Sequence, residues 1–469
     1  MGHRVLIVTE DRLSPAMAGP AIRAWQMAGA LADHGHQVVL ATTVPSSLSP
    51  SGFTIETVDE RRVAELERWC EVLVIQGYVL HRLPVLRSSD KILVCDLYDP
   101  LHLEVLELTA AEPEPERSTN VANAVATLAE HLRRGDFFLC AGSKQRDLWL
   151  GFLAAEGRVN ADNYDRDPTL RSLVSDVPFG RPDDPPVRTR AALRGAVPGI
   201  DAGDQVVLWG GGVYDWLDPE TLVRAADGLR TEHPRLRVFF LGVRHPNPAV
   251  EPARTLTAAR QLSDALELTG SHVFFNDSWV AYDDRQNYLL DADVGVSLHL
   301  EHLETAFSFR ARVVDYLWAG LPIVCSAGDG FADLVAAEGL GVVVPPRDPV
   351  AVADALHGLL ADPEHRRRVG ERVAHVGDRF RWSAVLDPVI RFCDDPRRAA
   401  DVPQWPTPDD DGATEVEDPV VAGWWAGAKR DLRTASRLAR QGGAAAIARA
   451  ARDRLVRSAR RSRHGPDGA

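Results

Sequence analysis

Short runs of β-branched and other apolar residues alternate with helix-like segments along most of this chain, and the pattern occurs twice. The runs cover residues 4–9, 37–42, 72–75, 91–96 and 137–141 in the first half, and 205–209, 237–241, 273–275, 294–298, 323–325 and 342–344 in the second. Strands that alternate with helices form parallel sheets covered by helices on both faces. We therefore expect an α/β protein with two lobes, each binding ligands at the carboxyl ends of its strands.

Proline-rich and charged segments divide the chain further. Three prolines between Arg181 and Val187 indicate a linker, so we predict a first lobe at residues 1–182 and a second at 183–383. A helix at 384–396 is predicted to cross back to the first lobe. Residues 397–420 carry too few apolar side chains to form a core and are predicted to be an acidic linker. A basic amphipathic, helical tail is predicted at residues 421–469.

The uneven charge of the chain restricts its partners. The net charge is −14, which disfavours nonspecific nucleic-acid binding by the body of the protein. Residues 428–469 nevertheless hold twelve Lys or Arg against three Asp, a net charge of +9. Together with Trp424 and Trp425, this composition predicts that residues 424–463 lie on an anionic membrane surface. The alternative is a solvated basic tail that folds back on the acidic body.

The five cysteines are scattered in apolar runs without metal or disulfide spacing, which is typical of core residues in a reducing compartment. We see no signal peptide, because residues 4–9 form a strand that leads into charged residues. The sequence contains no run of 18 consecutive apolar residues, which is about the length that a membrane-spanning helix needs. We expect a cytoplasmic protein. The basic tail would allow it to attach peripherally to the inner face of the membrane.

The stretch from Leu300 to Val324 carries the strongest sign of a ligand site. Its apolar spacing predicts a helix from about residue 309, with Ser308, Arg310 and Arg312 at the N-terminus. Free N–H groups and positive charge together favour an anion of phosphate size. Asp315, a turn and a half further on, is placed to accept hydrogen bonds from sugar hydroxyls beside that phosphate.

This stretch resembles glycosyltransferase family 4, whose members are retaining, use nucleotide sugars and have the GT-B fold of two Rossmann-like lobes. In that family a Glu, seven residues and a second Glu precede an Ala-Gly-x-Pro turn, and the second carboxylate holds the ribose. Asp315 lies five residues before Gly320, where the second carboxylate belongs. Phe307 occupies the position of the first, and Glu304 is the nearest acid. The resemblance covers about residues 4–395.

Glycines provide the other expected donor contacts. Residues 210–212 are three glycines directly after a strand, where the backbone can approach a ligand closely; a bare tight turn is the alternative. The Arg and Lys with which the family clamps the pyrophosphate are absent here, so Arg310 and Arg312 are the expected substitutes. One of the two could instead pair structurally with Asp315 or Glu304. The predicted donor-binding residues are Gly19, Arg23, Gly211, Gly212, Glu304, Ser308 and Asp315.

Polar residues of the first half follow the strand at 91–96 and are expected at the acceptor side. They are Asp96, Tyr98 and Asp99, with His102 as the candidate for touching a sugar or sharing a proton. The family often has a histidine near this place. Each of these roles has an alternative. His102 could be a surface or capping residue, Gly19 could simply form a turn, and the side chain of Arg23 could be solvated.

His299, Glu301 and His302 suggest metal ligands, but no fourth ligand has recognisable spacing, so no metal or other cofactor is predicted. The resemblance implies a retaining glycosyltransferase that moves a sugar from a nucleotide sugar to a saccharide or lipid-linked acceptor, in cell-envelope polysaccharide or glycolipid synthesis. His102, Arg310 and Arg312 would act in catalysis. The alternatives are a nucleotide-sugar epimerase of the same architecture and a catalytically inactive GT-B scaffold that binds a partner.

Overall fold

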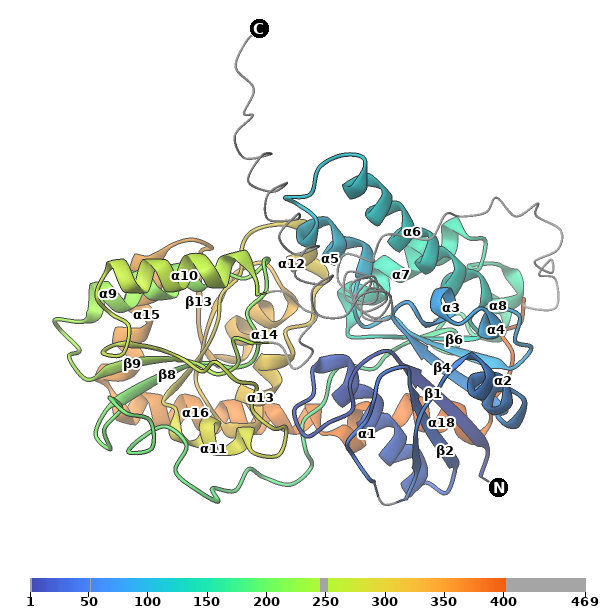
Figure 1. The fold of residues 1–469 in the computed structure, drawn as a ribbon, viewed down its shortest axis with the longest axis horizontal. Coiled ribbons are helices and arrows are strands. Elements are labelled where there is room, and N and C mark those ends of the chain that lie inside the picture. The colour runs from blue at the N-terminus through green and yellow to red at the C-terminus, as the bar shows by residue number, and fades with distance from the viewer. Residues whose placement is uncertain (1, 51, 245–251, 402–469) are drawn as a thin grey trace, which may run out of the picture. The chain divides into compact units, whose positions relative to one another are not determined.

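A computed structural model describes residues 2–50, 52–244 and 252–401 of the 469-residue chain (Figure 1). The described residues form two α/β lobes, each with an all-parallel sheet, as the sequence predicts. Most of the predicted acidic linker and all of the basic tail lie outside the described residues, so the membrane prediction for residues 424–463 stays a prediction. Among the described helices, none is long and apolar enough to cross a bilayer.

The sheet of the first lobe has seven parallel strands in the order β3-β2-β1-β4-β5-β6-β7. The strands are β1 (Arg4–Thr9), β2 (Gln37–Thr42), β3 (Thr54–Thr57), β4 (Val72–Gln76), β5 (Ile92–Asp96), β6 (Phe137–Cys140) and β7 (Val174–Asp176). The helices are α1 (Gly19–Asp33), α2 (Glu60–Trp69), α3 (Val79–Arg82), α4 (Pro84–Arg87), α5 (Leu101–Leu108), α6 (Glu116–Arg134), α7 (Ser143–Ala155) and α8 (Ala161–Arg166).

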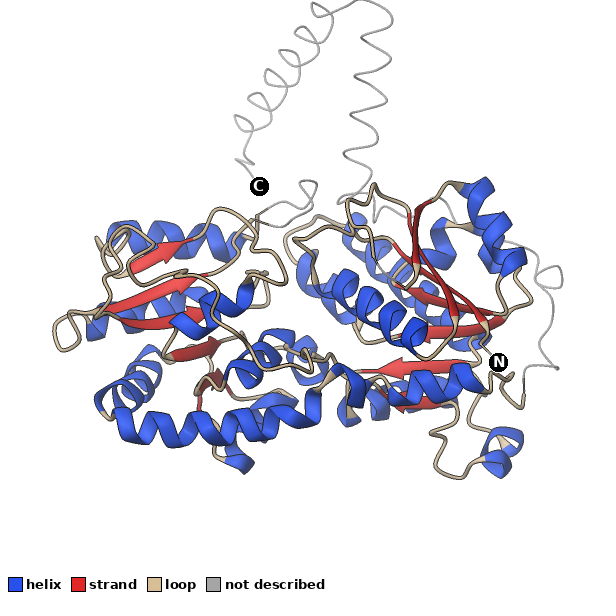
Figure 2. Cartoon of the chain, turned by 90° about the horizontal axis from the view of Figure 1, so that it is seen from below, coloured by secondary structure: helices blue, strands red, loops and turns tan. Residues whose placement is uncertain are grey.

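Both faces of this sheet are buried, because successive residues of a strand point to opposite sides. In β1, Val5 and Ile7 belong to the core beneath α1, whereas Leu6 and Val8 belong to the core beneath α2, α3, α4, α6 and α7. Continuous apolar runs such as residues 5–8 are therefore needed in the central strands. Figure 2 shows helices on the two sides of the strands in each lobe.

The second lobe repeats the plan with six parallel strands in the order β10-β9-β8-β11-β12-β13. These are β8 (Gln205–Trp209), β9 (Leu236–Phe240), β10 (Val273–Phe275), β11 (Val294–Ser297), β12 (Ile323–Ser326) and β13 (Gly341–Val344). The helices are α9 (Pro219–Leu229), α10 (Arg254–Ala265), α11 (Arg285–Asp291), α12 (Leu303–Phe307), α13 (Ala311–Ala319), α14 (Gly330–Glu338), α15 (Pro349–Ala361) and α16 (Pro363–Gly377). Helices α9, α10 and α15 lie on one face, and α11, α13 and α16 on the other (Figure 1).

The chain passes between the lobes twice, and the two passages are hydrogen-bonded to each other. The Arg181 amide donates to the Phe380 carbonyl (2.7 Å), and the Trp382 amide donates to the Arg181 carbonyl (2.9 Å). Beyond this point α17 (Trp382–Val385) and α18 (Asp387–Asp394) return to the first lobe. Their apolar side chains complete the core on the α1 face of its sheet.

The predicted start of the acidic linker at residue 397 is wrong. Arg398 forms an ion pair with the buried Asp136 (3.1 Å), and the amide of Ala399 donates to the same carboxylate (3.0 Å). Asp401 accepts two hydrogen bonds from the guanidinium of Arg158, at 2.7 and 2.9 Å. Residues 398–401 are therefore fastened to the first lobe through ion pairs whose partners lie far away in the sequence.

The remaining differences from the sequence predictions are local. The sequence does not predict strands β3 and β7, because residues 54–57 and 174–176 are short and contain one strongly apolar residue each. The five cysteines are free and buried, as expected of core residues.

Candidate functional site

The carboxyl ends of β8 and β11 lie side by side at the point where the second sheet changes winding direction, which is where such sheets bind ligands. The turn after β8 contains the three glycines, and Gly211 has φ +89°, a conformation that disfavours other residues. The hydroxyl of Tyr316 accepts from the Gly210 amide (2.7 Å) and donates to the Val296 carbonyl (2.7 Å). Tyr316, which sequence reasoning missed, thus ties the glycine turn to the neighbouring strand.

Arg312 in α13 faces this glycine turn. Its Nη2 donates to the Gly212 carbonyl (2.6 Å), and its guanidinium lies 4.8 Å from the ring centre of Trp209. No carboxylate of the described residues forms an ion pair with it, and Nη1 has no hydrogen-bond partner among them. Burial lowers the pKa of Arg312 to about 10, so the group is still a cation at neutral pH. An enclosed cation without a counter-ion is the strongest anion-binding feature of the site.

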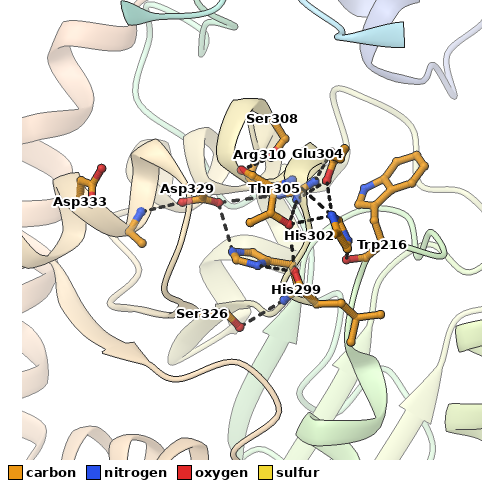
Figure 3. A network of polar contacts seen from close by, with 12 residues as sticks. Trp216, His299, His302, Glu304, Thr305, Ser308, Arg310, Ser326, Asp329 and Asp333 are labelled. Atoms are coloured by element: carbon orange, nitrogen blue, oxygen red, sulfur yellow. Dashed lines mark hydrogen bonds and ion pairs between the residues drawn. The ribbon is translucent and has the colours of Figure 1, made fainter. Parts of the chain in front are cut away.

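Arg310, which was predicted to act with Arg312, is occupied by an internal partner. Its two terminal nitrogens donate to the two oxygens of Glu304, at 3.0 and 2.9 Å, and both side chains are almost fully buried. Glu304 therefore neutralises Arg310, and it does not present a free carboxylate to a sugar as predicted. Figure 3 shows this pair at the centre of a polar network. Ser308 lies beside it and donates to the Thr305 carbonyl (3.1 Å), a local bond at the end of α12.

The histidines of this network fix the loops around Arg310. The Nε2 atom of His299 lies 3.4 Å from a carboxylate oxygen of Asp329, and that oxygen lies 3.8 Å from Nε of Arg310 (Figure 3). Burial opposes ionisation of Asp329, but His299 and Arg310 hold its pKa below the usual value. His302 accepts from the Thr305 amide (3.3 Å) as the N-cap of α12. Asp329 has no motif of its own, and only its place in a Gly-Asp-Gly turn could have suggested it.

Asp315 retains about a quarter of its side-chain exposure and binds Arg285, whose Nε donates to it at 2.9 Å. Arg285 is stacked between Tyr282 (3.6 Å to the ring centre) and Trp318 (4.7 Å). One oxygen of Asp315 is thus held by Arg285, and partial exposure leaves the carboxylate accessible to a ligand hydroxyl. Sequence reasoning missed Arg285, since no pattern joins it to Asp315.

In the first lobe, Arg23 and Asp96 bind each other. Nε and Nη2 of Arg23 donate to the two oxygens of Asp96 at 2.7 and 2.9 Å, and both side chains are fully buried. Each side chain thus has an internal partner here, and the contacts of Arg23 with a diphosphate and of Asp96 with an acceptor stay predictions. Gly19 lies against Tyr98, whose hydroxyl would be 2.9 Å from an added Cβ. Tyr98 is also buried, with Arg23 4.9 Å from its ring centre.

Three carboxyls of the first lobe share an enclosed region at the carboxyl ends of its strands. Burial, helped by the charges of Asp96 and Asp11, raises the pKa of Asp99 to about 7. Burial also raises the pKa of Asp11 to about 6. The pKa of Glu104 is well above its usual value because of burial and the nearby Asp99 and Glu304. Of the three, only Asp99 was predicted at this site; Asp11 and Glu104 were missed.

His102 does not have the expected surroundings of a proton-sharing group. It is 8% exposed, and its ring lies 5.3 Å from that of Phe152 and 6.0 Å from that of Trp149. Burial lowers its pKa to about 4, and Nδ1 has no hydrogen-bond partner among the described residues. His102 is thus a neutral imidazole packed against aromatic side chains in this structure, and its role in touching a sugar or sharing a proton stays a prediction.

Gln145 connects the two halves of the site. Its amide nitrogen donates to the Tyr98 carbonyl (2.7 Å) in the first lobe and to the Phe307 carbonyl (2.8 Å) in the second. Its oxygen accepts from the Ala141 amide (2.8 Å), so the orientation of the side chain is fixed. Helix α12 accordingly contacts α5 and α7. The Phe307 position, where a carboxylate was expected, supplies a backbone contact between the lobes.

Comparisons with known proteins relate part of the chain to glycosyltransferases. Residues 204–362 match the family described as glycosyl transferases group 1. A D-inositol 3-phosphate glycosyltransferase of Kineococcus radiotolerans is 30% identical over 257 residues, which are 50% of this chain and 54% of that protein. A phosphatidyl-myo-inositol mannosyltransferase of Mycobacterium leprae is 34% identical over 84 residues, 18% of this chain and 22% of the relative. The chain spans about half the length of the first of these relatives, and less of the second.

A solved structure provides the fold comparison. Anabaena HepE in complex with UDP-glucose matches with a TM-score of 0.63 over 84% of this chain and 99% of that one. The two sequences are 12% identical, so this likeness concerns the fold.

Proposed function

We propose that this chain, which has the GT-B fold and whose second lobe matches the glycosyl transferases group 1 family, transfers a sugar from a nucleotide sugar to a hydroxyl acceptor. The observation that carries the proposal is Arg312, an enclosed guanidinium without a carboxylate partner among the described residues, next to a glycine turn. The leaving group of a nucleotide sugar is a diphosphate, and a preorganised cation stabilises the charge that develops on it.

The donor would lie on the second lobe. Its diphosphate would face Arg312 and the first amides of α13, and its ribose would be held by Asp315. In the reaction the bond between the sugar carbon and the diphosphate oxygen breaks, the acceptor hydroxyl oxygen bonds to that carbon on the same face, with retention, and the hydroxyl proton passes to the departing diphosphate. Arg310 would contribute less charge than Arg312, because Glu304 already neutralises it. The complex of Anabaena HepE with UDP-glucose supports a UDP-sugar as the first donor to test.

We propose that the donor needs no metal ion. Arg312 supplies, from the protein, the positive charge that a magnesium ion provides in other diphosphate sites. Binding of the nucleotide diphosphate should therefore be the same with magnesium and with a chelator.

The acceptor would lie on the first lobe beside Asp99, Glu104 and Asp11. Carboxyl groups in an enclosed region are good partners for the hydroxyls of a polyol or saccharide. We therefore propose a saccharide or lipid-linked acceptor that offers hydroxyls here, in cell-envelope polysaccharide or glycolipid synthesis. The curated relatives, named for inositol phosphate and phosphatidyl-inositol, support polyol acceptors in general.

Thermal unfolding with UDP, GDP, dTDP and ADP, each with magnesium or with EDTA, tests the donor site. A ligand at 100 times its dissociation constant stabilises the folded state by about 2.7 kcal/mol. One diphosphate should raise the midpoint equally under both conditions. No shift with any nucleotide would favour the inactive scaffold.

Product analysis then separates the remaining alternatives. A transferase consumes the nucleotide sugar only when an acceptor is present and forms a product whose anomeric configuration, read by NMR, matches the donor. Conversion of the donor without an acceptor would favour the epimerase.

The basic tail at residues 424–463 is proposed to hold the enzyme on anionic membranes. Flotation with vesicles containing phosphatidylserine should recover the full chain, and recover less of a chain that ends at Val420. Equal recovery of both chains would remove the membrane proposal and leave the transfer reaction unaffected.

A further inference from the structure

A cluster of three potential metal ligands lies at the edge of the second sheet opposite the proposed donor site. Glu232 and His233 are in the turn between α9 and β9, and His357 is in α15. Strands β8 and β9 begin at this edge, whereas the glycine turn and Arg312 are at the edge where β8 ends. The glycosyl-transfer site does not use these residues.

The ligand atoms converge. Nε2 of His233 is 3.0 Å from Nδ1 of His357, and a carboxylate oxygen of Glu232 is 3.5 Å from the same Nδ1. One ligand atom from each residue lies within 4.8 Å of the others. Two nitrogens bound to one tetrahedral zinc ion are separated by about 3.3 Å, given zinc–nitrogen bonds of about 2.0–2.1 Å. To hold an ion, the two histidines would separate slightly and their rings would turn, so that both lone pairs point at one position between them.

A neighbouring glutamine fixes the tautomer of His233. The amide nitrogen of Gln205 donates to the Leu360 carbonyl (2.9 Å), so the amide oxygen of Gln205 must be the atom 3.2 Å from Nδ1 of His233. Nδ1 therefore carries the proton and donates it to Gln205. The lone pair of Nε2 consequently points at His357. The hydrogen bond from Nδ1 to Gln205 is of the kind that orients metal-bound histidines.

The cluster also has room for a ligand from solvent. The side chain of Glu232 is 63% exposed and that of His357 is 43% exposed, whereas His233 is buried. Without a metal, the proton on Nδ1 of His357 would bridge the two imidazoles as a simple hydrogen bond. With a metal, both nitrogens would donate lone pairs, Glu232 would add an oxygen, and water would complete the shell.

We propose that Glu232, His233 and His357 form a binding site for a divalent transition-metal cation of the zinc class. Two imidazoles and one carboxylate suit zinc, cobalt and nickel better than magnesium or calcium, which prefer oxygen ligands. The ion would join α15 to the turn before β9 and would act on the stability of the second lobe. It would have no part in the transfer reaction.

The test uses the full chain, stripped with EDTA and then titrated with Co²⁺. We expect one equivalent to bind with the visible absorption of four- or five-coordinate cobalt, and Zn²⁺ to displace it. Zn²⁺ should also raise the thermal midpoint. His357→Ala and Glu232→Gln alter exposed ligands, so they should retain the parent's midpoint without metal and lose at least about tenfold in Co²⁺ affinity.

His365→Ala serves as the matched control, because His365 is an exposed histidine on α16, outside the cluster. It should bind Co²⁺ like the parent. The proposal is overturned if His357→Ala retains the parent's Co²⁺ affinity, if the cobalt spectrum shows only six-coordinate ions, or if no equivalent binds. UDP-induced stabilisation, measured on the same samples, should not change with any of these variants.

Discussion

At the scale of single residues, the two arginines that begin α13 have different surroundings. Arg310 has a buried carboxylate partner in Glu304, whereas Arg312 has none among the described residues. Removing one member of a buried ion pair leaves the other charge uncompensated, but removing an unpaired cation relieves an existing cost. Substitutions at the two positions should therefore affect stability and binding in opposite ways.

Arg312→Met should leave the unfolding free energy unchanged or higher, and it should abolish stabilisation by UDP. With a suitable donor, kcat/KM should fall by about 100- to 1000-fold, the size of the effect when one charge-stabilising donor is lost. Thermal unfolding with and without UDP measures both quantities on one sample. Undiminished UDP stabilisation of the variant would contradict the role given to Arg312.

Arg310→Met should lower the unfolding free energy by about 3–5 kcal/mol, because Glu304 is left buried and unpaired. The double variant Glu304→Leu/Arg310→Met should recover most of that loss. Urea unfolding of the parent, both single variants and the double variant gives the interaction energy. Additive effects of the single variants would show that the pair does not act as a unit.

Asp99 should make stability depend on pH. Its pKa is about 7 in the folded protein and 3.8 in a model peptide, so the folded state binds more protons than the unfolded state between these values. The unfolding free energy therefore falls as pH rises through this window. Above about pH 7, Asp99→Asn should be more stable than the parent by about 1 kcal/mol, after discounting for partial exposure, and near pH 4 the two should agree. Urea unfolding at several pH values provides the measurement, and parallel pH profiles would contradict the prediction.

The sequence could indicate these residues but not their partners. Ser308, Arg310, Arg312 and Asp315 follow one another in a pattern that predicts an anion site. The pairing of Arg23 with Asp96 joins positions 73 residues apart, and nothing local in the sequence reveals it. The burial of His102 against Trp149 is equally hidden from the local sequence, because the two residues are 47 positions apart and meet only when helix α7 packs in the folded lobe.

At the scale of elements, most strands and helices could be predicted because their apolar patterns are long and regular. The strands that were missed, β3 and β7, have three or four residues each and lie at the two edges of the first sheet. Edge strands are covered on fewer sides, so their sequences carry less of the apolar signal on which the prediction depends. The extension of the packed chain to Asp401 was missed because polar residues hold it.

The docking of α17 on the first lobe depends on a glycine. A Cβ at Gly180 would be 2.5 Å from two ring carbons of Trp382, so Gly180→Ala should push the tryptophan away and cost about 1–3 kcal/mol. Gly228→Ala is the matched control, since nothing lies within 4 Å of its Cβ position and alanine favours the helix there. Urea unfolding should show a loss for the first variant and a small gain for the second. Equal stabilities would contradict the close-contact argument.

At the scale of the whole molecule, the chain leaves the first lobe near Arg181 and returns to it through Trp382. Two passages bonded to each other form a hinge point, and lobe motion about such a point is the usual way for a two-lobed enzyme to enclose its substrates. Residues 398–401 then fasten the returning chain to the first lobe through Asp136 and Arg158.

Asp401→Ala should loosen this fastening. The guanidinium of Arg158 is nearly fully buried and would lose its bidentate partner, which should lower the unfolding free energy by about 2–4 kcal/mol. Hydrogen exchange should rise in α8 and β6 of the first lobe and stay unchanged in the second-lobe strands. Asp395→Ala, at an exposed residue of the same segment, is the control and should behave like the parent. Equal exchange in the Asp401 variant would contradict the role of the ion pair.

The return of the chain also affects how the protein is made. Synthesis proceeds from the N-terminus, so all seven strands of the first sheet emerge from the ribosome well before α18, whose side chains cover the α1 face of that sheet. During that interval the newborn first lobe exposes the apolar surface that Val389, Ile390 and Cys393 later bury. We therefore expect chaperones to bind the nascent chain until α18 has been synthesised. A protein truncated before α18 would keep this apolar surface exposed and should also bind chaperones.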